Sequence, residues 1–310
     1  MPRQTEEEQA DFARAMRSVA EQTPMPQTEV DTLSMLEGAD FDRFRAVWDT
    51  LPAGARARLI RALHAAAEQR LRLDFSALNR LALEDADPQV RLAGVQSVIE
   101  DRSPALLLKL LELVKSDPSV DVRSAAAEDL PRFTLLGELG DLDPELTARL
   151  RADLQQVARD DSQAPRVRTA ALAALGYFSD TGIAEELVAG FSNPDMRLGA
   201  VRGMGRSADP RWTDRLMPVL GSEDPQLRQE AARALGEIED ERALTPLIEI
   251  VDDPVGEVRL AVIEALGHIG GEDAREALLY LAEAPEDEIR EAAEHALEEI
   301  EAAEGDPLDL

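Results

Sequence analysis

The stretch that decides the fold is residues 222–281, SEDPQLRQEAARALGEIEDERALTPLIEIVDDPVGEVRLAVIEALGHIGGEDAREALLYL. One motif occurs twice in it: an Asp-Pro pair, an apolar residue followed by arginine, and a run of small and apolar residues that reaches Ala-Leu-Gly. The two arginines of the motif, Arg228 and Arg259, are 31 residues apart. Helical sequence that recurs with a period of this length is typical of a stacked array of helical hairpins.

The step from an apolar residue to arginine recurs along most of the chain. Its arginines are Arg91, Arg123, Arg168, Arg197, Arg228, Arg259 and Arg290. They are 29 to 32 residues apart, except for the 45 residues between Arg123 and Arg168, which place an insertion near residues 131–145. A weaker copy of the motif, ARARLIRALHAAAE, puts Arg58 in the same position of an earlier unit. We therefore expect about eight units.

Each unit has the pattern of two short helices. Asp-Pro or Asn-Pro pairs precede most of the arginines, and they favour a helix start because the side-chain oxygen caps a free N–H and proline needs none. Apolar or small residues then recur at i, i+4 and i+8, which predicts one buried face on each second helix. Gly176, Gly236 and Gly267 follow the last apolar residue, where we expect them to end the helix in a left-handed conformation.

The repeated pattern D-P-x-x-V-R-x-x-A-x-x-A-L-G-x-I resembles HEAT repeats, most closely the short variety found in bilin lyase subunits. The resemblance is clear from about residue 83 to 300, weaker over 40–82, and absent before 40. It implies an all-α fold, an α-solenoid that forms a right-handed superhelix of about eight two-helix repeats. It also implies that each repeated arginine binds acids and carbonyl groups at the turn of its own or the neighbouring unit, so we interpret the seven arginines as structural rather than as an anion track.

The chain ends and the insertion stand outside the repeat. We expect a helical cap over 1–39, a repeat array over 40–304 and a mobile acidic tail over 305–310. The insertion, PRFTLLGELGDLDPE, is too apolar for a merely solvated loop. It either packs over the neighbouring units or contacts a partner.

The composition excludes several kinds of chemistry. The 310 residues include 33 Lys and Arg against 63 Asp and Glu, a formal net charge of -30, and no cysteine. Disulfides and thiolate metal sites are therefore excluded. The negative charge disfavours nucleic acid and anionic lipid and favours a basic protein or peptide as partner. No apolar stretch approaches a bilayer span, and the amino end lacks the order of a secretory signal, so we expect no membrane insertion and a cytoplasmic protein.

No catalytic motif is present. The three histidines, His64, His268 and His295, are too few and too scattered for a metal site, and the His-Glu pairs of the HEAT-like iron hydroxylase are missing. We expect no cofactor and no metal. The predicted function is a non-catalytic protein-interaction scaffold or adaptor, and the alternative is an enzyme or enzyme subunit of the bilin lyase-like or metal-dependent hydroxylase-like type.

A candidate partner site lies in the fifth to seventh units. Positions one and five after each arginine point away from the buried face, so we expect Leu198, Arg202, Gln229, Arg233 and Leu260 on the surface. The two leucines would form an apolar interface core, or else pack under neighbouring helices. With Arg206, Trp212 and Arg215 the region is locally positive, and we expect an acidic or C-terminal peptide to dock at the Arg202 and Arg233 patch.

Overall fold

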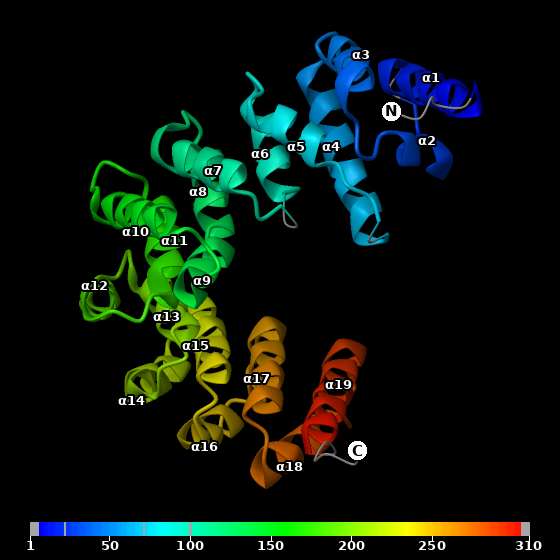
Figure 1. The fold of residues 1–310 in the computed structure, drawn as a ribbon. Helices are drawn as coiled ribbons and strands as arrows, with labels where there is room; N and C mark the ends of the chain where they lie inside the picture. Colours follow the sequence, from blue (N-terminus) through cyan, green and yellow to red (C-terminus); the bar gives the residue numbers. More distant parts are fainter. Residues whose placement is uncertain (1–5, 22, 71, 99–100, 305–310) are drawn as a thin grey trace. The chain divides into compact units, whose positions relative to one another are not determined.

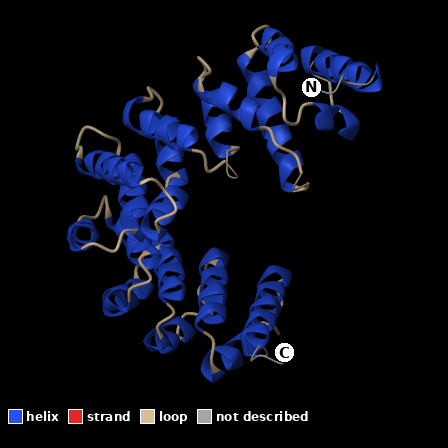
Figure 2. Cartoon of the chain, in the orientation of Figure 1, coloured by secondary structure: helices blue, strands red, loops and turns tan. Residues whose placement is uncertain are grey.

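The computed structural model describes residues 6–21, 23–70, 72–98 and 101–304 (Figure 1). Every regular element in these ranges is a helix, as Figure 2 shows, which confirms the predicted all-α class. Among the described residues, no helix combines the length and the apolar character needed to cross a bilayer. The tail expected at 305–310 lies outside the described residues. The helices form two compact units that divide between Leu130 and Pro131.

The first unit contains two leading helices and three helix pairs. Its helices are α1 (Glu6–Glu21), α2 (Gln27–Thr32), α3 (Gly38–Trp48), α4 (Ala53–Glu68), α5 (Ser76–Leu83), α6 (Pro88–Gln96), α7 (Pro104–Ser116) and α8 (Val120–Asp129). Consecutive helices give the pairs α3–α4, α5–α6 and α7–α8. Helix α5 packs on α6 and α7 on α8, and the second helices α4, α6 and α8 pack one against the next. Helix α1 turns Phe12, Ala15 and Val19 into the core and packs on α2 and α3, as an end cap of a repeat array must.

The second unit contains an added helix and five pairs. Its helices are α9 (Pro131–Leu139), α10 (Pro144–Arg159), α11 (Pro165–Ala174), α12 (Thr181–Ser192), α13 (Arg197–Arg206), α14 (Thr213–Leu216), α15 (Pro225–Ile238), α16 (Leu244–Ile248), α17 (Gly256–Ile269), α18 (Glu272–Leu281) and α19 (Asp287–Glu304). The second helices α11, α13, α15, α17 and α19 pack in that order. The first helices α12, α14, α16 and α18 form a separate layer along this stack (Figure 1).

The insertion is helix α9, and it packs within the second unit. Phe133 and Thr134 are fully buried, and a Cβ atom at Gly137 would lie 2.8 Å from the Thr147 side chain of α10. Leu135 and Leu139 are 37% and 65% exposed on the outer side of the same helix. One side of the insertion therefore packs against neighbouring helices, as the first of the two alternatives expected. Its outer side leaves two leucines exposed.

The glycines of the motif do not end the second helices. Gly236 and Gly267 lie inside α15 and α17, so the expectation of left-handed helix ends at these positions is wrong. The left-handed position after α15 is Glu239, with φ of 56°, and two glycines with positive φ follow α17, Gly270 and Gly271, with φ of 67° and 88°. Gly236 instead lets two helices touch, because a Cβ atom there would lie 2.7 Å from the Ala265 Cα of α17.

The same close approach is tighter between α11 and α13. A Cβ atom at Gly199 would lie 2.3 Å from the Thr169 carbonyl oxygen, a distance that real Cβ atoms do not reach. A Cβ atom at Gly176 would lie equally close to the Gly203 carbonyl oxygen. Backbone therefore packs on backbone here, and the sequence requires glycine for lack of space rather than for a special φ.

The Gly199→Ala variant tests this packing. Alanine favours a helix interior over glycine by about 1 kcal/mol, but the clash with the Thr169 carbonyl must shift α13, so we expect the free energy of unfolding to fall by about 2 kcal/mol or more. Urea denaturation measures it. The matched control is Gly256→Ala in the first turn of α17, where an added Cβ meets nothing within 4 Å. An equally small effect of both variants would contradict the packing argument.

Candidate partner-binding site

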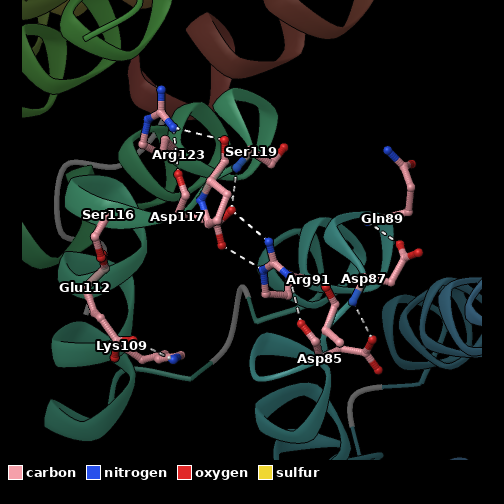
Figure 3. A network of polar contacts seen from close by, with 12 residues as sticks. Asp85, Asp87, Gln89, Arg91, Lys109, Glu112, Ser116, Asp117, Ser119 and Arg123 are labelled. Carbon is pink, nitrogen blue, oxygen red and sulfur yellow. Dashed lines mark hydrogen bonds and ion pairs between the residues drawn. The ribbon is translucent and has the colours of Figure 1, made fainter. Parts of the chain in front are cut away.

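The repeated arginine holds consecutive turns together, as Figure 3 shows for Arg91. Its Nε and Nη2 atoms donate to the two carboxylate oxygens of Asp117 at 2.7 and 2.9 Å. Its Nη1 atom donates to the carbonyl oxygens of Asp85 and Ala86, in the turn before its own helix, at 2.8 and 2.9 Å. One edge of the guanidinium thus binds the carboxylate of the next turn, and its Nη1 atom binds the carbonyl groups of its own turn.

Asp117, the acid that accepts hydrogen bonds from Arg91, lies in the turn before α8 and does not cap that helix. The Asp117 carboxylate accepts from the Ser119 N–H at 2.8 Å, and α8 begins only at Val120. Asp253 repeats the arrangement: it accepts from the Val255 N–H at 2.9 Å and from Arg228 at 2.7 and 3.0 Å. The hydrogen bonds from Arg228 hold the pKa of the Asp253 carboxyl below its usual range. The expectation that an Asp-Pro or Asn-Pro pair opens the second helix is therefore wrong at these two positions, and also at Asn193, because α13 begins only at Arg197.

The Asp-Pro pairs at the other second helices do cap them. The Asp87 carboxylate accepts from the Gln89 N–H at 2.8 Å at the start of α6. The Asp224 carboxylate accepts from the Gln226 N–H at 2.9 Å at the start of α15. Proline follows each cap at the first position of the helix, where no N–H is needed.

The remaining repeated arginines make parts of the same contact set. Arg123 donates to the Asp117 carbonyl oxygen at 2.6 Å, Arg168 to that of Ala158 at 3.0 Å, Arg197 to that of Phe191 at 2.9 Å and Arg290 to that of Ala284 at 3.3 Å. Arg259 donates to the Glu286 carboxylate of the next unit at 3.2 Å. Outside α13, each arginine is the fourth residue of its helix. All seven side chains therefore bind turns within the stack.

Arg56 occupies this position in the first pair, and not Arg58. Arg56 is the fourth residue of α4, and it donates to the Leu51 carbonyl oxygen at 2.9 Å and to the Asp85 carboxylate at 2.8 Å. Arg58 lies two residues later and is exposed. The helix start at Ala53, rather than the spacing to Arg91, sets which arginine reaches the turn.

A second polar contact joins neighbouring turns in the second unit. The Asp240 carboxylate accepts from the Thr213 hydroxyl at 2.7 Å and from the Arg242 Nε at 2.9 Å. Arg242 also donates to the Asp214 carboxylate at 2.9 Å and to the Pro210 carbonyl oxygen at 3.0 Å. These hydrogen bonds, from Arg242 first and from Thr213, lower the pKa of Asp240 to about 2.

The structure does not bring all of the predicted partner residues together. Trp212 is 5% exposed, and its indole N–H donates to the Ser207 hydroxyl at 3.0 Å, so it belongs to the core and not to a partner surface. Arg215 is in α14, and its guanidinium carbon lies 5.5 Å from the centre of the Phe191 ring of α12. Both residues lie in the first-helix layer. Closeness in sequence to Arg202 was the signal that grouped them with the residues of the second helices.

The other six predicted residues do lie on the second helices. Leu198, Gln229 and Leu260, one position after the arginine, are all half-buried. Arg202, Arg206 and Arg233 lie further along α13 and α15, toward the exposed side. The apolar positions therefore lie at the edge of the packed face, and the charged ones beyond it.

Positions five and nine after the repeated arginine form what we call the second-helix face. Its members are Arg202 and Arg206 on α13, Arg233 and Glu237 on α15, Glu264 and His268 on α17, and His295 and Glu299 on α19. All of these side chains are exposed except Arg202 and Arg206, which are half-buried. Because the helices pack in this order, the charge changes from positive at α13 to acidic and histidine-bearing at α17 and α19.

A hollow of about 260 Å³ opens at the positive end of this face. It is lined by Arg202, Arg206, Glu230, Arg233, Ala234 and Glu237. Arg202 donates to the nearly buried Glu230 carboxylate at 2.5 Å, and an Arg233 nitrogen lies 3.7 Å from the same carboxylate. Another Arg233 nitrogen lies 3.8 Å from the Glu264 carboxylate. Two of the three arginines are thus held by acids of the protein.

Arg206 is the exception. It forms no hydrogen bond or ion pair with any residue that the structure describes. Burial lowers the pKa of its guanidinium, because the surroundings solvate the charged form poorly. Burial also raises the pKa of Glu237, although part of that side chain stays exposed. Within the described residues, no three His, Asp or Glu side chains come close enough together to hold a metal ion.

Removing the Asp253 carboxylate tests the contact between turns. We expect Asp253→Ala to lower the free energy of unfolding by about 2 to 3 kcal/mol, because Arg228 and the Val255 N–H both lose their acceptor. Urea denaturation measures the change. Asp214→Ala is the matched control, since Asp214 is 75% exposed where it pairs with Arg242, and exposed pairs contribute about 0.5 kcal/mol. Equal losses in the two variants would show that burial of the pair is irrelevant.

The Asp240 contact predicts a pH dependence. A carboxyl whose pKa is about 2 when folded, against 3.8 ordinarily, stabilises the fold above that ordinary value. The stabilisation is lost as the pH falls toward about 2. The difference in unfolding free energy between wild type and Asp240→Asn is therefore expected to be constant near neutral pH and to shrink below about pH 4. Urea denaturation across this range measures it, and a difference that stays constant down to pH 2.5 would refute the assignment.

Comparison with known proteins supports the repeat assignment. Residues 184–261 and 246–298 match the family described as HEAT repeats. No curated protein matches the chain. Similar solved structures include YibA of Escherichia coli, which is 17% identical, with coverage of 96% of this chain and 99% of that chain and a TM-score of 0.42.

Two further solved structures show the range of these likenesses. A designed armadillo repeat protein in complex with the peptide (KR)4 is 17% identical, covers 63% of this chain and 99% of its own, and has a TM-score of 0.41. Human deoxyhypusine hydroxylase is 20% identical, with coverage of 95% and 97% and a TM-score of 0.34. At such values we draw no functional argument from these structures. The family match and the observed helix pairs together identify residues 184–298 as HEAT repeats within an α-solenoid.

Proposed function

We propose that this chain is a non-catalytic scaffold that binds a protein partner on the second-helix face of α13, α15, α17 and α19. The observation that supports the proposal is the regular placement of polar side chains on that face. Each of the second helices α13, α15, α17 and α19 presents two charged or histidine side chains at equivalent positions. The contacts of Arg228 with Asp253 and of Arg259 with Glu286 support this regular placement, since they tie the starts of α15 and α17 to the next turn. A preformed surface of this kind binds with little loss of conformational entropy.

The charges of the face define the chemistry of the partner. The acidic and histidine-bearing end at α17 and α19 suits a basic protein or peptide, and the hollow at α13 and α15 suits an acidic peptide. A net charge of -30 repels nucleic acid and anionic lipid, so we propose neither as a ligand. The alternative, an enzyme of the bilin lyase-like or metal-dependent hydroxylase-like type, would be supported by metal or a visible-absorbing tetrapyrrole in the purified protein.

A charge-swap variant tests the proposed surface. Arg233→Glu combined with Glu264→Arg keeps the net charge and the ion pair between the two positions, but it exchanges the positive and the negative charge on the face. A protein partner is first isolated on the wild-type chain and identified, and its dissociation constant is then measured with purified components. We expect the swap to weaken binding by about tenfold or more, because like charges then oppose each other across the interface.

The matched control swaps an ion pair in a first helix. Lys109 and Glu112 of α7 are 3.1 Å apart, and Lys109→Glu with Glu112→Lys makes the same exchange away from the proposed face. This control is expected to bind like wild type. Loss of binding in the control and not in the face variant would place the partner site elsewhere.

A further inference from the structure

We propose that the hollow between α13 and α15 binds a carboxylate group of the partner, with Arg206 as its main donor. This inference rests on the proposed function, and it names the chemical group that one end of the second-helix face recognises. It follows from three observations: the pairing of the neighbouring arginines, the position of the nearest free acid, and the balance of charge in the hollow.

Arg206 differs from its neighbours in forming no hydrogen bond or ion pair with the described residues, although the nearby Tyr177, Glu237 and Glu230 groups favour its charge. Arg202 ties α13 to α15 through Glu230, and Arg233 lies between Glu230 and Glu264. The Arg206 guanidinium lines the same hollow but forms no hydrogen bond or ion pair with a described residue. A guanidinium that is partly removed from water and has no acceptor loses more solvation than it recovers in protein contacts. An anion in the hollow would restore that loss.

The acid nearest at hand does not fill this role. Glu237 lines the hollow from α15, but its carboxylate lies against the backbone of α13 at Gly205, where a Cβ atom would be 2.5 Å from its Oε2 atom. Because Gly205 has no side chain, the Glu237 carboxylate can pack against its backbone, and it forms no ion pair with Arg206. Both groups remain available to a ligand that approaches from solvent.

The charge and the size of the hollow favour a carboxylate over a phosphate. Its lining contains three arginines and two glutamates, which leaves one positive charge in excess. One carboxylate neutralises that excess, whereas a phosphate monoester carries about two negative charges at pH 7 and would face Glu230 and Glu237. A volume of about 260 Å³ admits one side chain or one terminal residue. The planar guanidinium of Arg206 matches the two oxygens of a carboxylate.

The experiment uses four acetylated alanine tetrapeptides as probes, titrated into the full-length protein by NMR chemical-shift mapping. One carries a single glutamate and an amidated end, a second has only a free terminal carboxylate, a third carries glutamine with an amidated end, and a fourth carries phosphoserine. We expect one of the first two to bind, which distinguishes a side-chain from a terminal carboxylate, and the glutamine peptide not to bind. Shifts are expected on α13 and α15.

Arg206→Gln separates a binding role from a structural one. Because Arg206 has no hydrogen bond or ion pair with a described residue to lose, and burial opposes its charge more than its neighbours favour it, we expect Tm to stay unchanged or to rise, while the affinity for the carboxylate peptide falls about tenfold or more. Arg215→Gln, an exposed arginine of the first-helix layer, serves as the matched control and is expected to bind like wild type. A fall in Tm for Arg206→Gln with unchanged peptide affinity would overturn the proposal.

Two further outcomes also decide the question. Tighter binding of the phosphoserine peptide than of both carboxylate peptides would overturn the choice of anion. Failure of all four peptides, with the charge-swap effect on the protein partner intact, would overturn the carboxylate site and leave the scaffold function standing. Failure of the charge-swap experiment itself would instead remove the proposed function.

Discussion

The fold depends on an arginine near the start of each second helix whose guanidinium is shared between turns. A guanidinium has five N–H donors in one plane, so it can bond the carbonyl groups of its own turn and still face a carboxylate of the next. Arg91 and Arg228 do both, and Asp117 and Asp253 are the acids that receive them. The pair is nearly buried, and each acid is further satisfied by a backbone N–H, which offsets the cost of removing both charges from water. The contact ties α6 and α15 to the next turn, and Arg56 and Arg259 do the same for α4 and α17 through Asp85 and Glu286.

The glycines complete this constraint. The backbones of α11 and α13, and of α15 and α17, come close enough that a single methyl group would not fit at Gly199 or Gly236. Close packing over the length of a helix leaves little freedom to rotate about its axis. The exposed side chains of successive second helices are therefore fixed relative to one another, and they form a row to which a ligand could bind.

That row explains how an acidic chain can carry a local site of the opposite sign. Most basic side chains described here are occupied by turns, carbonyl groups and neighbouring acids. Arg206 is not, because the acid opposite it, Glu237, rests over Gly205. The candidate site thus arises from a packing detail in the second-helix stack rather than from a cluster of positive charge. Binding by this face needs no catalytic group, which fits a scaffold.

Periodicity alone established the helix pairs and their number, because a buried helical face and a repeated turn each leave a pattern with a constant spacing. The structural use of the arginines came from the resemblance to HEAT repeats. The same pattern did not assign Arg56 over Arg58, since the helix start at Ala53 decides which side chain reaches the turn. It did not separate a glycine needed for space from one needed for conformation, as at Gly236, because both follow an apolar residue. Nor did it place Trp212 in the core or single out Arg206, since burial and pairing depend on neighbours distant in sequence. Local patterns encode helices and turns, whereas which side chains lose their partners emerges only when the helices pack.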